Sequence, residues 1–195
     1  MGMSLVTSPL HLKYVVKLKK MSLKVPETVN FEQAIALTQS LLSQVEADIQ
    51  EPEIATVISE LVKTESGARG FFVTYLTSES SLADNPSPAI VQALQTSPEV
   101  VAELLVKNLA MSAAQVLFHR RNHNEEMAQA SERVRQRTAY LIELVDLTAL
   151  RDRIHKLSQT LAQGEGEYKA FLERWGYDTE QQQAISQALQ QVISK

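Results

Sequence analysis

The stretch that decides the fold is SPEVVAELLVKNLAMSAAQVLFHRRNHN, residues 97–124. On a helical projection of about 100° per residue, the apolar side chains of residues 98–121 cover most of the circle. A helix that is apolar on nearly every side is surrounded by protein. Ser97 and Pro98 are typical of a helix start. One stripe is charged and is the predicted solvent edge: Glu99, Glu103, Lys107 and Arg121.

The end of this stretch has the charge order of two helices joined by a turn. Cations come first: His119, Arg120, Arg121 and His123. Asn124 follows as a good N-cap, and Glu125 and Glu126 come next. Cations stabilise a helix C-terminus and anions an N-terminus. The order therefore favours a joint between two helices, with one continuous helix as the alternative.

Helical spacing of apolar residues extends over the rest of the chain. It predicts helices over 31–49, 52–66, 68–75, 88–95, 125–162, 168–175 and 178–193. Two helix starts have predicted caps: Asn30, with Gln33 three residues later, and Asp178. Gly67 is a predicted helix end. As one helix, residues 125–162 would be about 57 Å long. We expect an all-α protein: a single domain of about six helices around a largely buried central helix.

The predicted domain covers residues 21–195, with a Ser- and Pro-rich linker at 77–97. Residues 1–20 form a basic N-terminal extension that has four lysines and no acid. The extension is interpreted as a poorly structured tail or the product of an upstream start codon. The alternative is a basic tail that binds an acidic partner or a membrane surface.

Composition excludes several classes of protein. The chain has 195 residues, no cysteine and a net charge of −4. Disulfides and cysteine-ligated zinc are therefore impossible. Without the four lysines of residues 1–20 the net charge is −8, which disfavours general binding to nucleic acid. No apolar run approaches the roughly 18 residues of a spanning helix, so no transmembrane segment is expected.

A polar row on the central helix is the candidate site. Its members recur at helical spacing opposite the charged stripe: Asn108, Ser112, Gln115, His119 and His123. Buried polar groups must be paired, so this row predicts a hydrogen-bond network between helices or a groove for a ligand or partner. A third interpretation is a metal site, in which His119 and His123 would share a cation with Glu126.

Two further functions remain open as alternatives. The chain lacks the G-x-S-x-G, P-loop and G-x-G-x-x-G signatures, which favours a non-enzymatic protein without a cofactor. A small-molecule or metal-dependent enzyme would use His119, His123 and Glu126. An RNA-binding protein would use a basic surface made of Arg120, Arg121, Arg133 and Arg137, although glutamates are interleaved there.

Four segments carry a resemblance to known sequences: GARGFFVTYL, LLVKNLAMS, HRRNH and FLERWGYD. They resemble an uncharacterised helical protein of cyanobacteria or plastids, and the resemblance implies no activity. It implies a location in the cytoplasm or the plastid stroma. The leading hypothesis is a non-enzymatic binding or assembly protein, with a protein partner or a second copy of itself bound to the groove on residues 98–121.

Overall fold

The computed structural model describes residues 23–45 and 50–194, so the predicted extension at 1–20 lies outside the described residues. Within them the chain forms nine α-helices and one 3₁₀ turn, and no strand. These are α2 (Phe31–Val45), α3 (Glu51–Leu61), α4 (Glu65–Thr77), η1 (Ser81–Ala83), α5 (Pro88–Gln95), α6 (Pro98–Arg121), α7 (Glu125–Val145), α8 (Thr148–Gln163), α9 (Lys169–Trp175) and α10 (Thr179–Ile193). The all-α class is confirmed, and the expected number of about six helices is too low.

One reason for the larger number is a break inside residues 125–162. Asp146 ends α7 in the left-handed conformation, with φ 36° and ψ 52°. Leu147 is extended, and α8 begins at Thr148. Aspartate tolerates the left-handed region better than most residues, so the chain turns here without glycine or proline. The single long helix considered from the sequence is therefore wrong.

A second difference concerns Gly67, which lies inside α4 and does not end α3. Thr64, the residue directly before α4, caps this helix, because its hydroxyl accepts a hydrogen bond from the Gly67 amide at 3.1 Å. A Cβ at Gly67 would lie 2.2 Å from the Leu61 carbonyl oxygen. Glycine at this position therefore allows α3 and α4 to approach closely, and the helical prediction for 68–75 is confirmed.

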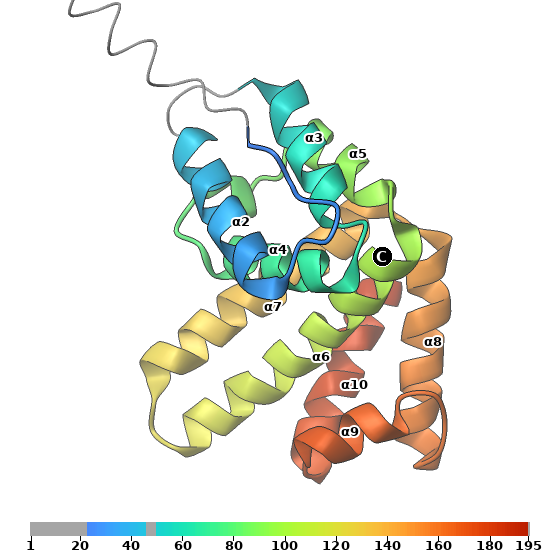
Figure 1. The fold of residues 1–195 in the computed structure, drawn as a ribbon. Helices are drawn as coiled ribbons and strands as arrows, with labels where there is room; N and C mark the ends of the chain where they lie inside the picture. The colour runs from blue at the N-terminus through green and yellow to red at the C-terminus, as the bar shows by residue number, and fades with distance from the viewer. Residues whose placement is uncertain (1–22, 46–49, 195) are drawn as a thin grey trace, which may run out of the picture.

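Helix α6 is the central helix of the protein. Figure 1 shows it running through the middle of the molecule, with α2 to α5 on one side and α8 to α10 on the other. It contacts α4, α5, α7, α8 and α10. Its buried residues include Leu104, Leu105 and Val106, three successive positions, so more than one side of the helix is covered. The prediction of a largely buried central helix is confirmed.

Helix α6 is also, among the described helices, the one that is long and apolar enough to cross a membrane. However, 61% of its most apolar window is buried inside the protein. A core helix meets the same test of length and composition, so the helices packed around α6 explain its apolar character. The expectation of no membrane-spanning segment is consistent with this packing.

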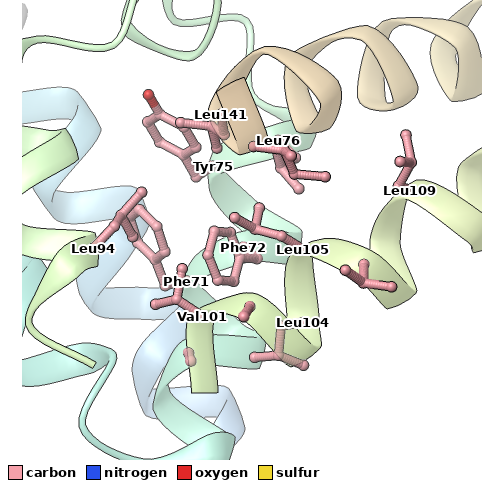
Figure 2. Packing of buried hydrophobic residues seen from close by; sticks show 14 of the residues in the cluster. Phe71, Phe72, Tyr75, Leu76, Leu94, Val101, Leu104, Leu105, Leu109 and Leu141 are labelled. Carbon is pink, nitrogen blue, oxygen red and sulfur yellow. The ribbon is translucent and has the colours of Figure 1, made fainter. Parts of the chain in front are cut away.

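The aromatic residues of α4 form the centre of the core against α6 (Figure 2). Phe71 and Tyr75 stack with ring centroids 5.1 Å apart, and Phe72 packs edge-on against Phe71 at 5.2 Å. Leu105 of α6 lies beside them. The buried Tyr75 hydroxyl donates to the Leu82 carbonyl at 2.5 Å, so its polar end is paired.

The joint between α6 and α7 is confirmed as the sequence indicated. Helix α6 ends at Arg121, and the Asn124 side chain accepts a hydrogen bond from the Met127 amide at 3.1 Å. His123 lies between them with a positive φ of 54°. At the other end of α6, Pro98 is in the first turn, but the Ser97 side chain makes no capping bond.

Candidate functional site

The predicted polar row does not lie along a single cavity. Ser112 is buried, and its hydroxyl donates to the backbone carbonyls of Asn108 at 2.7 Å and Leu109 at 3.1 Å. The side chains of Asn108, Gln115 and His119 are half-buried, and His123 is exposed at the joint. The row thus runs from the interior out to solvent. Asn108 is the member that lines the groove described below.

The metal candidates lie around the α6–α7 joint without forming a cluster. The His119 ring packs edge-on against Phe118, with centroids 5.4 Å apart. His123 and Glu126 are both exposed. In the described part of the chain, no three His, Asp or Glu side chains are grouped so that they could hold a metal ion. A structural zinc site needs four ligands and a catalytic one three protein ligands, so this arrangement lacks the donors.

The four arginines considered as a basic surface are engaged by acids. Arg137 is buried and binds Asp84, while Arg133 binds the Glu79 carboxylate at 2.9 Å. Arg121 binds Asp178 at 2.5 Å and also pairs with Glu180. Arg120 lies 4.0 Å from Glu125. These arginines therefore link elements of the fold, and they do not form one exposed patch.

A groove between α4, α6 and α9 is the strongest candidate for a binding site. We call it the α4–α6–α9 groove; its volume is about 580 Å³, within the usual range for ligand sites. Its apolar lining includes Phe72, Val73, Leu76, Leu104, Phe171 and Trp175. Three of these are buried and form the floor, while Val73 is 45% exposed and Trp175 is 44% exposed.

Helix α9 forms the outer wall of this groove. None of its seven residues is buried, and it begins directly after the buried Tyr168. Gly164 and Gly166 precede it and Gly176 ends it, all three with positive φ. The Trp175 ring stacks on the Tyr177 ring with centroids 6.5 Å apart, so the exposed Trp175 is held by an aromatic neighbour. The tyrosines on both sides of α9 thus attach it to the body of the protein.

Charged and polar groups lie along one side of the groove. Lys107 Nζ is 2.6 Å from Glu103 Oε1, so these two residues, one helical turn apart, form an ion pair. The Tyr168 hydroxyl donates to Glu103 Oε2 at 2.7 Å. Burial raises the pKa of Glu103, but the hydrogen bonds from Lys107 and Tyr168 outweigh it, so the pKa lies below its usual value. Burial and the bond to Glu103 raise the pKa of Tyr168.

Arg153 of α8 extends this cluster. Its guanidinium binds Glu167 at 2.5 Å and Glu99 at 3.2 Å, and its Nε lies 3.5 Å from Glu103 Oε2. Lys156 also binds Glu167, at 2.9 Å. The stripe predicted as the solvent edge of α6 is therefore partly covered by α8 and by Tyr168. No local sequence pattern indicated that Arg153 and Tyr168 would cover this stripe, because they lie more than 50 positions away from Glu99 and Glu103 along the chain.

The chemistry of the groove suits binding better than proton transfer. A general acid or base works best with a pKa close to the operating pH. Here the pKa of Glu103 is lowered and that of Tyr168 is raised, so near neutral pH one stays a carboxylate and the other a phenol. The groove offers fixed charges, hydrogen-bonding groups and apolar surface to a partner.

Comparisons with known proteins place the chain in one family. Neither the curated proteins nor the solved structures gave a match. A family profile described as "Uncharacterised conserved protein UCP020893" matches residues 30–192, from the residue before α2 to the last turn of α10. This span includes every element that lines the α4–α6–α9 groove. The chain belongs to the family of uncharacterised conserved protein UCP020893.

Proposed function

We propose that the protein is a non-enzymatic binding protein whose α4–α6–α9 groove receives the apolar face of a helix from a protein partner. The observation that carries the proposal is the pair Val73 of α4 and Trp175 of α9, two large apolar side chains that line one groove and are left exposed. Grooves between helices commonly bind amphipathic helices through apolar residues spaced three and four apart. Buried Phe72 and Leu104 supply the floor for such side chains.

The surroundings of the groove support a protein partner. Exposed aromatic residues are enriched where proteins bind one another, and Trp is among the strongest contributors to binding energy. Asn108, Lys107 and Glu103 add hydrogen-bonding groups along one side. A reducing compartment, the cytoplasm or a plastid stroma, suits a chain without cysteine.

No specific observation favours the two alternative functions. For an enzyme built on His119, His123 and Glu126, the described residues provide no metal-binding group. For RNA binding through Arg120, Arg121, Arg133 and Arg137, all four guanidinium groups have acidic partners. The helix-binding groove therefore remains the proposal with direct support.

The test is selection of peptides of about 20 residues from a random library displayed on phage, with the full-length protein as target. The expected peptides carry apolar residues at helical spacing. Their affinity should fall at least about tenfold for Trp175→Ser. Phe118→Ser is the matched control, because Phe118 is an exposed aromatic residue at the α6–α7 joint and is 48% exposed. Failure to enrich peptides, or equal binding by Trp175→Ser and wild type, would overturn the proposal.

A further inference from the structure

Two unpaired arginines face the same groove. Among the lysines and arginines that the structure describes, only Lys24, Arg69 and Arg174 make no ion pair. Arg69 of α4 and Arg174 of α9 both line the α4–α6–α9 groove, and both are exposed. The cations that the fold leaves without acids are therefore concentrated at one site.

Most of the acidic side chains that line the groove already have cationic or hydrogen-bonding partners within the protein. Glu103 binds Lys107 and Tyr168, and Glu167 binds residues of α8. Glu65 also lines the groove and has no cationic partner among the described residues. It occupies the first turn of α4, where the helix dipole favours an anion. The unpaired charges that the groove offers a partner are therefore two cations, Arg69 and Arg174, and one anion, Glu65.

The Arg69 guanidinium is placed to bind a carboxylate. It lies over the Phe31 ring, 5.6 Å from the ring centroid. A guanidinium held above a ring face keeps N–H groups that are directed away from the ring. Those N–H groups match the two oxygens of a carboxylate, which they bind through two parallel hydrogen bonds.

We infer that the partner helix is acidic, and that Arg69 and Arg174 bind carboxylates on either side of its apolar face. This inference rests on the proposed function, because it names the chemistry of the helix that the groove receives. The apolar floor takes the apolar face, while the two arginines select glutamate or aspartate over lysine at the flanks. A basic helix is disfavoured, because its positive side chains would lie against the positive charges of Arg69 and Arg174.

A peptide suits these observations better than RNA does. The chain without residues 1–20 carries a net charge of −8, which repels a long polyanion wherever it leaves the groove. A short helix touches only the groove and meets the two arginines.

The experiment compares two synthetic helical peptides with the same apolar face, one flanked by glutamates and the other by lysines. Binding to the full-length protein is measured by fluorescence anisotropy. We expect the glutamate peptide to bind at least about tenfold more tightly. The preference should shrink as the salt concentration rises from about 0.1 M to about 1 M. Arg69→Gln/Arg174→Gln should abolish the preference while retaining binding.

Lys24→Gln/Arg151→Gln is the control, since it removes the same charge from residues that do not line the groove. It should bind like wild type, and loss of the preference in this variant would overturn the inference. Equal binding of both peptides would overturn the inference and leave the helix-binding groove standing. Binding of neither peptide would overturn both. Displacement of the glutamate peptide by a single-stranded RNA of equal charge would assign the arginines to nucleic acid and also overturn the inference.

Discussion

Arg137 of α7 and Asp84, the residue after η1, form a two-pronged ion pair in which Nε lies 2.7 Å from Oδ1 and Nη2 lies 3.0 Å from Oδ2. The Arg137 side chain is only 4% exposed. Its Nη1 also donates to the carbonyls of Leu76 at 2.9 Å and Ser78 at 2.7 Å. These carbonyls belong to the end of α4, where helical partners run out. The Arg137 side chain thus supplies the donor that the last carbonyls of α4 lack, and it fixes the position of the segment between α4 and α5.

Replacing Arg137 by methionine should lower the free energy of unfolding by about 3 kcal/mol. The loss has two causes: Asp84 loses its partner, and the Leu76 and Ser78 carbonyls lose their donor. Arg133→Met is the control on the same helix, because Arg133 pairs with Glu79 in an exposed ion pair. It should cost less than about 0.5 kcal/mol. Urea denaturation measures both, and equal losses would contradict a special role for the buried arginine.

The same ion pair should make stability depend on pH in the acid range. The hydrogen bond from Arg137 holds the pKa of Asp84 below its usual value in the folded protein. The unfolded carboxyl titrates at about 3.9, so the contribution of Asp84 is present above that pH and is lost as pH falls through the lower folded pKa. The difference in unfolding free energy between wild type and Asp84→Asn should therefore be constant near neutrality and shrink below about pH 4. The same comparison in the Arg137→Met background should show no such pH dependence. If the effect of Asp84→Asn on the unfolding free energy still varied with pH, Arg137 would not be the cause of the lowered pKa of Asp84.

The two N-cap positions around α6 and α7 should respond differently to alanine. Asn124 accepts a hydrogen bond from the Met127 amide, and losing this cap should cost about 1 kcal/mol. Ser97 occupies the matching position before α6, but its side chain caps nothing, so Ser97→Ala should cost less than about 0.3 kcal/mol. Thermal unfolding followed by circular dichroism compares the two. A larger loss for Ser97→Ala would contradict the observed capping.

Replacing Tyr168 by phenylalanine should lower the free energy of unfolding by about 2 kcal/mol. The hydroxyl donates to a charged acceptor, Glu103, and both groups lie in the interface beneath α9. Tyr140→Phe is the control, because Tyr140 is an exposed tyrosine on α7, and it should be close to neutral. Chemical denaturation of the two variants provides the measurement. Equal effects would show that the bond from Tyr168 adds little.

Gly70→Ala should destabilise the protein by about 1 to 3 kcal/mol, although alanine is the better helix former. A Cβ at position 70 would lie 2.5 Å from the Ala34 Cβ and 2.7 Å from the Phe31 carbonyl oxygen. Both atoms belong to α2, so α2 would have to move. Ser66→Ala, at an exposed position of α4, is the control and should change stability by less than about 0.5 kcal/mol. Stabilisation by Gly70→Ala would contradict the close approach of the two helices.

Helix ends were predictable where the signal is local. Asn30 and Gln33 exchange the hydrogen bonds of a capping box, as their spacing indicated. Asp178 caps α10 as predicted, and Gln181 completes a second capping box there. Asp146 was missed because its turn needs neither glycine nor proline. Gly67 was misassigned because a glycine that ends a helix and one that admits a neighbouring helix look alike in sequence.

The candidate site was predictable only in part, because a groove depends on which helices pack together. Of the polar row on α6, Asn108 lines the groove, and the role of the row in binding stays a prediction. Arg69 and Arg174 lie more than 100 positions apart, and only the packing of α4 and α9 around α6 brings them to one groove. The interpretation of Glu103 as solvent-facing holds only in part for the same reason, since Tyr168 partly covers it from a distant part of the chain.

The absence of a side chain at Gly70 also lets one edge of the groove's mouth lie close to α4. Phe31, the first residue of α2, lines one edge of that mouth, and its backbone rests against Gly70. A single methyl group there would push this edge outward, although Gly70 is not among the residues that line the groove. In the proposed function, a bulkier residue at this position would widen the groove and so change which partner helices fit, without itself contacting the partner.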